Sequence, residues 1–146
     1  MTMTLHDLAR FGLLFTPSWK VVSEERIVSE AHLRRLLHGG RPELLQGHEG
    51  PEWWSPVGTR HASCQWDGIG VGGELFKGGL GNQLLFIATQ ADVVIAHFGT
   101  NPDLETPPLL LPLRRMVAEL FPAESHQGSR VSDEPETRAP SQREHH

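Results

Sequence analysis

The fold is decided by the stretch Leu75-Phe76-Lys77-Gly78-Gly79-Leu80-Gly81-Asn82-Gln83 and by the apolar runs that follow it. Residues 84–88 and 92–98 are dominated by Val, Ile, Leu and Phe, which is the composition of buried strands. Residues 90–92, Gln-Ala-Asp, are suited to a tight turn between the two strands. The glycine-rich corner exposes backbone N–H groups at a sheet edge. It is therefore either a binding or catalytic site or only a place where the chain bends.

The sequence around this corner predicts a sheet of three to four antiparallel strands. We expect a loose hairpin turn after the first strand, because glycines recur between Trp66 and Leu75. The expected strands lie at about residues 59–67, 73–78, 83–89 and 92–98.

Three helices are expected, at residues 4–16, at about 24–38 and at 112–121. Thr4 is a good N-cap for the first helix, and Pro17 should end it. Ser23 and Ser29 are alternative caps for the second helix, with Gly39 as its stop.

The third helix has the clearest amphipathic pattern in the chain. Pro112 suits a first helical turn, and the apolar side chains that follow fall on one face. These side chains are Leu113, Met116, Val117, Leu120 and Phe121. We therefore predict an α+β fold in which this helix packs on one face of the antiparallel sheet, with the N-terminal helices beside it.

Composition limits the classes of partner. The 146 residues carry a formal charge of −5, and Lys occurs only at Lys20 and Lys77, which argues against a nucleic-acid partner. No stretch reaches the ~20 apolar residues of a membrane span.

Residues 1–4 lack the features of a signal peptide, so the default expectation is a cytoplasmic protein, although the compartment stays open. Residues 1–121 should form one domain, and residues 122–146 should be disordered because they lack apolar periodicity.

The ordered set of short motifs from Thr4 to Phe121 resembles the C-terminal part of the β-lactamase-related serine hydrolases. The closest likeness is the class-C-like branch of esterases and amide hydrolases that includes the 6-aminohexanoate-dimer hydrolases. Lys77-Gly78-Gly79 is similar to the family's Lys-Thr-Gly strand, and Gln65-Trp66-Asp67 to its Gln-Trp segment. Leu8-Ala9-Arg10-Phe11-Gly12 resembles the family's Asp-Leu-Ala-Arg-Phe-Gly helix. The resemblance implies a partial β-lactamase or transpeptidase-like fold.

The resemblance also implies roles for individual residues. Lys77 would present its ammonium group to the substrate carboxylate or to the nucleophile, and the N–H group of Leu80, which follows Gly79, would be an oxyanion donor. Gly78 replaces the family's Thr and so removes a hydroxyl group, which points to esters or linear amides as substrates. The Ser-x-x-Lys and Tyr-x-Asn motifs are missing, because Pro17 and Glu74 stand where the nucleophilic serine would be and the chain has no tyrosine.

We therefore expect a hydrolase segment that is inactive alone, and whether the chain is itself an enzyme stays open. The alternative is a non-catalytic module that binds a ligand between Trp53, Trp54, Trp66 and Lys77, with Gly78 beside it. Neither hypothesis requires a cofactor, and self-association through an exposed sheet edge is expected.

Other chemical interpretations are less favoured by the sequence. The run Gly78–Gly81 is not followed by a helix or by Walker spacing, which argues against a phosphate cradle. His61 and His97 lack metal-ligand spacing, so we predict no metal site. Cys64 is expected to be a small buried residue; its use as a nucleophile with His61 or His97 is the minor alternative.

Overall fold

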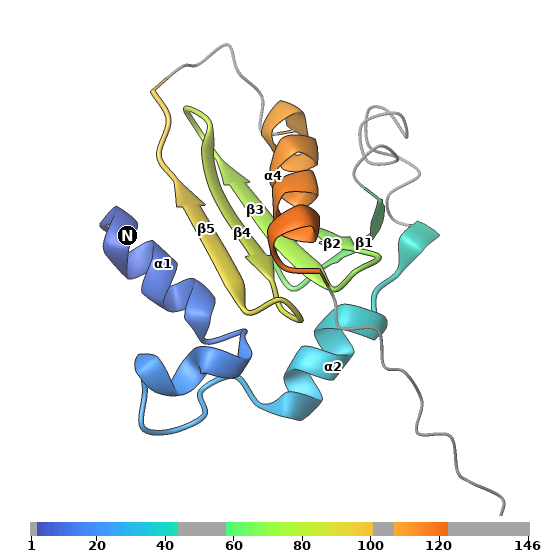
Figure 1. Cartoon of the computed structure of the whole chain (residues 1–146). Helices are drawn as coiled ribbons and strands as arrows, with labels where there is room; N and C mark the ends of the chain where they lie inside the picture. The colour runs from blue at the N-terminus through green and yellow to red at the C-terminus, as the bar shows by residue number, and fades with distance from the viewer. Residues whose placement is uncertain (1–2, 44–57, 101–106, 123–146) are drawn as a thin grey trace, which may run out of the picture.

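The centre of the molecule is an antiparallel meander in which each strand pairs with the next along the chain (Figure 1). The computed structural model describes residues 3–43, 58–100 and 107–122. Five strands lie in these residues, in the order β1-β2-β3-β4-β5. Their bounds are β1 Thr59–Ser63, β2 Trp66–Gly70, β3 Glu74–Gly79, β4 Gln83–Ala88 and β5 Val93–His97. The α+β class with an antiparallel sheet is thus confirmed, with five strands in place of three to four.

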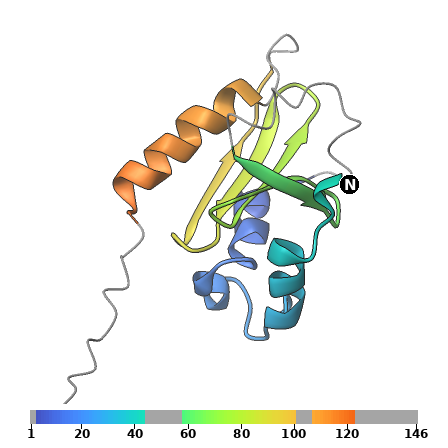
Figure 2. The same cartoon turned by 90° about the vertical axis from the view of Figure 1, so that its right-hand side faces the viewer.

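Helices cover both faces of this sheet (Figure 2). The first face carries α1 (Leu5–Leu13) and α2 (Glu30–His38), with the 3₁₀ helix η1 (Pro17–Val21) between them in the chain. The second face carries α4 (Pro107–Leu120).

Side-chain alternation along the strands builds one apolar core on each face. On β4, Leu85 and Ile87 belong to the core beneath α1 and α2, whereas Leu84 and Phe86 belong to the core beneath α4. Successive strand residues point to opposite faces, so a continuously apolar strand fills both cores. This explains why the apolar run after the glycine corner is the most buried strand of the sheet.

Local sequence signals set the helix ends. The Thr4 hydroxyl accepts a hydrogen bond from Asp7 N–H (3.1 Å), and the Ser29 hydroxyl accepts one from His32 N–H (3.2 Å). Each bond satisfies an N–H group that has no partner within its helix. The second helix therefore begins after Ser29, later than the expected residue 24, and Gly39 is its C-cap as expected. The first helix ends at Leu13, earlier than the expected residue 16, because Phe15 N–H and Thr16 N–H donate to the carbonyls three residues back (3.1 Å each). The Leu13 carbonyl also accepts a bond from the Thr16 hydroxyl (3.1 Å).

The prediction of one strand over residues 59–67 is wrong, because a hairpin turn divides this segment between β1 and β2. Cys64 and Gln65 have positive φ values of 51° and 71°, and they reverse the chain between β1 and β2. Two consecutive positive φ values are typical of a type I′ turn, which asparagine and glycine favour. Neither residue type occurs here, so the sequence does not signal the turn. The glycines at 68 and 70 lie in β2, and not in a loose turn as expected.

The predicted C-terminal helix also differs from the structure, because it begins at Pro107 and has Pro112 in its interior. The longer helix brings Leu110 onto the sheet beside Val117, and both are buried. At ~100° per residue, Met116 lies about 120° round the helix from the buried Leu110, and so it points away from the sheet. Leu113 is half-buried, but Met116, Leu120 and Phe121 are exposed and not buried as predicted.

Some predictions fall on residues that the structure does not describe. The expected disorder of residues 123–146 and the placement of Trp53 and Trp54 lie outside the described ranges. The outer strands of the described sheet are β1 and β5, so the expected self-association through a sheet edge concerns these two and stays a prediction.

Candidate functional site

A pocket of about 370 Å³ lies where α1 meets the ends of β2, β3 and β4. Its apolar side is built by Leu8, Phe11 and Phe15 from α1 and the turn that follows it. The opposite side brings together Trp66, Lys77, Gly78 and Gly79, four of the residues selected from the sequence.

The aromatic wall of the pocket is continuous with the core. Phe15 packs edge-on against Phe11 and against Trp66, with ring centroids 5.4 Å and 5.2 Å away. Such edge-to-face contacts fix ring orientation. Because Trp66 is buried, its indole is a rigid wall of the pocket and not a mobile contact for a ligand.

Asp67 binds the two polar groups at one end of the pocket wall, Lys77 and Gly78 N–H. One carboxylate oxygen of Asp67 pairs with the Lys77 ammonium, and the other accepts a hydrogen bond from Gly78 N–H (2.7 Å). The side chains of Lys77 and Asp67 are 48% and 35% exposed, so the pair is in contact with solvent; Lys77 belongs to the pocket wall, and Asp67 lies behind it. The expected free cation is therefore neutralised by a neighbouring carboxylate.

Leu80, the expected oxyanion donor, lies away from this pocket. It is in the tight β3–β4 hairpin, where Gly79 pairs with Gln83 and both Gly81 and Asn82 have positive φ. The residue is 95% exposed and is not part of the pocket wall. The structure thus brings Lys77, Gly78 and Gly79 to the site but leaves Leu80 at the hairpin tip.

Sequence reasoning missed several residues of the wall. His32 of α2, Cys64 and Gln65 of the β1–β2 turn and Gln83 of β4 also line the pocket. Cys64 is exposed, contrary to the expectation of a buried residue, because it occupies the turn. No residue type in this turn signals it, and so no local pattern placed Cys64 beside Lys77.

The histidines singled out from the sequence have structural contacts. His61 is buried, and its Nε2 donates to the Leu36 carbonyl (3.0 Å); His97 Nδ1 donates to the Asn82 carbonyl (2.9 Å). Within the described ranges, no cluster of three His, Cys, Asp or Glu side chains is suited to hold a metal ion.

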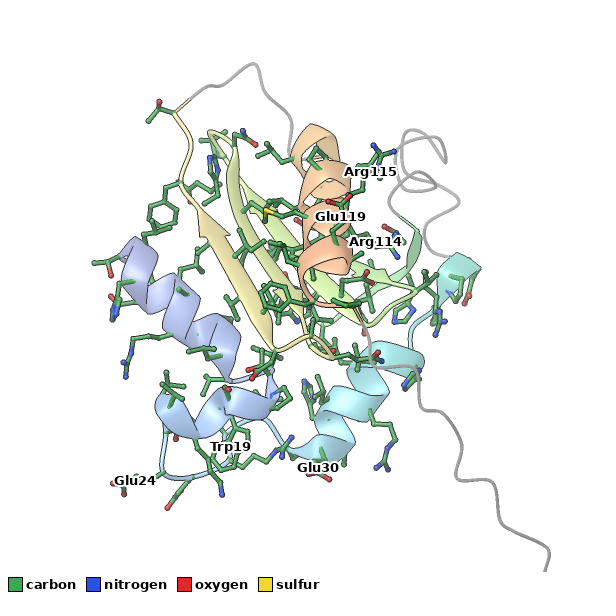
Figure 3. The ribbon with its side chains drawn as sticks, in the orientation of Figure 1. Trp19, Glu24, Glu30, Arg114, Arg115 and Glu119 are labelled. Carbon is green, nitrogen blue, oxygen red and sulfur yellow. The ribbon has the colours of Figure 1, made fainter. Side chains whose placement is uncertain are left out.

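A second hollow lies between α4 and the sheet, with a volume of about 900 Å³. Its walls include Phe86, Val117 and Phe121, together with Arg114 and Arg115, which Figure 3 shows on α4. Arg114 Nε donates to a Glu74 carboxylate oxygen (2.6 Å), so the charged wall of this hollow ties α4 to the sheet.

Among the residues that the structure describes, no helix has the length and apolar character to cross a membrane. Comparison with known proteins found no matching family model, no matching curated protein and no matching solved structure.

Proposed function

We propose that the chain binds a small, mainly apolar ester or amide in the pocket beneath α1 and does not hydrolyse it alone. One observation carries this proposal. Trp66, Lys77 and the two glycines after Lys77 share the wall of one pocket with apolar side chains of α1. An apolar pocket with a few polar groups at one end is the usual form of a small-molecule site.

The charge at the polar end favours a neutral ligand. Asp67 neutralises Lys77, so an anionic ligand would meet a carboxylate and a cationic ligand would meet an ammonium group. The carbonyl oxygen of an amide or an ester can accept a hydrogen bond from Lys77, which lies on the pocket wall. Both classes fit the pocket mouth without an unpaired charge.

The surroundings of the Cys64 thiol on the pocket wall favour ligand binding over catalysis. Cys64 contributes the thiol of the wall, and its Sγ accepts a hydrogen bond from Ser63 Oγ (3.4 Å). Within the described residues, no hydrogen bond joins this thiol to a histidine. His32 lies on the same wall, but without a hydrogen bond to a base the thiol is not activated as a nucleophile.

Calorimetric titration with N-benzylacetamide and benzyl acetate tests the proposal. We expect binding with a Kd of about 1 mM or tighter, which is the range for ligands of about ten non-hydrogen atoms. Product analysis of the same samples should show no hydrolysis above a heat-denatured control.

A pair of tryptophan variants locates the binding. Gln83→Trp places a ring at the wall and should abolish the signal, whereas Val71→Trp lies at the exposed β2–β3 turn and should leave it unchanged. Absence of binding to the folded wild-type chain, or equal loss in both variants, contradicts the proposal.

A second candidate function is the segment of a β-lactamase-like serine hydrolase, which the motif resemblance around Lys77 favours. In that case a nucleophile and its base would come from residues outside this chain. The DNA upstream of the Met1 codon provides the test: an open reading frame with Ser-x-x-Lys followed by Tyr-x-Asn supports it, and the lack of such a frame counts against it.

A further inference from the structure

The hollow between α4 and the sheet differs in charge from the pocket beneath α1. Among the residues that the structure describes, its wall carries three charged side chains: Glu74 of β3, and Arg114 and Arg115 of α4 (Figure 3). Glu74 pairs with Arg114, so these two charges cancel and Arg115 gives the wall a formal charge of +1. We propose that this hollow binds a small monoanion with an apolar body, of the class of a medium-chain alkyl carboxylate. The inference does not depend on the binding of a neutral ligand beneath α1.

The rest of the wall is mainly apolar and suits the body of such a ligand. Phe86 and Ala88 of β4 line the hollow from the sheet, and Val117, Ala118 and Phe121 line it from α4. Phe86 and Val117 are buried, whereas Phe121 is 48% exposed, so an apolar ligand would remove more of its surface from water. The volume of about 900 Å³ lies in the range of roughly 300–1,000 Å³ that is usual for small-molecule sites.

The spacing of residues on α4 explains why a cation borders this apolar wall. Leu110 and Val117 are seven residues apart and are buried against the sheet. Leu111 and Ala118 each follow by one residue, so they lie about 100° round the helix, on one flank of α4. Arg115 stands between them on the same flank, and all three line the hollow. Because Arg115 is exposed, the cation lies where the hollow meets water.

The Arg115 guanidinium is available to an anion. Within residues 3–43, 58–100 and 107–122 it forms no ion pair, and Glu119, one turn further along α4, is not part of the hollow wall. A guanidinium can donate two parallel hydrogen bonds to one carboxylate. A dianion would bring a second negative charge close to Glu74 without a further cation to balance it, so the wall favours a monoanion.

Calorimetric titration of the full chain with sodium decanoate, below its micelle concentration, tests the inference. We expect one site per chain with a Kd of about 1 mM or tighter. Octanoate should bind about tenfold more weakly, because each CH₂ group that is removed from water contributes about a factor of four. Equal affinities for the two chain lengths would show that no apolar wall takes up the alkyl chain.

Two pairs of variants locate the binding. Arg115→Gln should weaken decanoate binding by about threefold to tenfold, whereas Arg34→Gln removes an exposed cation of α2 and should have no effect. Ala118→Trp places a ring in the hollow and should weaken binding at least about tenfold. Ala31→Trp adds the same ring to the exposed side of α2 and should leave binding unchanged.

A further variant separates this hollow from the pocket beneath α1. Gln83→Trp should leave decanoate binding unchanged, since Gln83 lines only the other pocket. Loss of decanoate binding in Gln83→Trp overturns the inference, because it places the ligand beneath α1. Absence of binding to the folded wild-type chain overturns it too, as do equal affinities of Arg115→Gln and wild type. If Ala118→Trp does not fold, the Arg115 and Gln83 variants decide the outcome.

Discussion

At the scale of single residues, the closest packing constraint is the contact between Gly40 and the buried His61 ring. A Cβ atom on Gly40 would lie 1.7 Å from His61 Cδ2, and the ring is held by its bond to the Leu36 carbonyl. Gly40→Ala should therefore destabilise the protein by about 1–3 kcal/mol, the usual cost of overpacking a core.

Urea denaturation in a double-mutant cycle with His61→Ala measures this contact. The ring is absent in the double variant, so Gly40→Ala should cost much less there. Additive effects of the two substitutions would show that the ring and the glycine do not constrain each other.

Asp92 links the α1–η1 corner to the β4–β5 turn and should make stability depend on pH. Burial raises the pKa of Asp92, but hydrogen bonds from the Ser18 hydroxyl and Ser18 N–H, with the Thr16 hydroxyl nearby, outweigh it and hold that pKa below its ordinary value. A lowered folded-state pKa stabilises the protein above the unfolded-state pKa, and this stabilisation is lost as the pH falls through the folded-state pKa.

Asp92→Asn should consequently lower the free energy of unfolding at pH 7 and have less effect near about pH 2.5. The effect at pH 7 should be about 1 kcal/mol or less, since the side chain is exposed and screened. Asparagine also tolerates the positive φ of 57° at this position. Chemical denaturation at both pH values tests this, with Glu119→Gln on α4 as the control. An unchanged difference between wild type and Asp92→Asn at the two pH values would contradict the assignment.

The residue scale also shows what the sequence could not reveal about the site. Lys77 and its two glycines were selected because they resemble the Lys-Thr-Gly strand of the β-lactamase-related hydrolases. Asp67 was part of a quoted motif but received no role. Its contact with Lys77 depends on the register of β2 against β3, which the misplaced turn before β2 obscured.

At the scale of secondary structure elements, Glu74 and Arg114 hold α4 on the sheet. Arg114 Nε donates to one Glu74 oxygen (2.6 Å), and the other oxygen accepts a bond from Gly72 N–H (2.9 Å) in the β2–β3 turn. The Glu74 and Arg114 side chains are only 13% and 25% exposed. A part-buried charge that loses its partner keeps its desolvation cost, so breaking this pair should matter.

We expect Glu74→Gln to destabilise the protein by about 1–3 kcal/mol, measured by urea denaturation. The matched control is Glu30→Gln, which breaks the exposed pair with Arg26 (3.0 Å) and should cost about 0.5 kcal/mol or less. Arg26 also lies over the ring of Trp19, so it keeps a contact after the change. Equal costs for the two substitutions would show that Glu74 does not anchor α4.

Elements with strong local signals were predictable, and elements that depend on packing were not. Strands β3, β4 and β5 lie within one residue of their expected bounds, because their apolar runs end at recognisable turns. The start of α4 was missed since a proline in its interior resembles a first-turn proline. The β1–β2 turn was missed because neither Cys64 nor Gln65 favours positive φ.

At the scale of the whole molecule, the sheet lies between α1 and α2 on one face and α4 on the other. One hollow lies on each face, and the residues that line the two hollows differ. The pocket beneath α1 is bounded by aromatic rings and a charge pair, and the hollow beneath α4 is bounded by the anchored helix. The antiparallel sheet and the C-terminal helix on one face were predictable from periodicity. The pocket was not, because its wall combines α1, α2 and three strands whose mutual placement no local pattern specifies.

The central claim, that the pocket beneath α1 holds a small neutral ligand, can be tested through Cys64. This residue is the single cysteine of the chain, it is exposed, and it lies on the pocket wall. Its reaction rate with Ellman's reagent therefore reports on this wall alone. The control is the double variant Cys64→Asn/Val71→Cys, which moves the thiol to the exposed β2–β3 turn outside the pocket.

The measurement is the labelling rate with and without saturating N-benzylacetamide. The account predicts that the amide slows labelling of Cys64 in the wild-type chain and leaves the labelling rate of the relocated thiol in the control variant unchanged. Labelling of Cys64 at the same rate with and without the amide would contradict it.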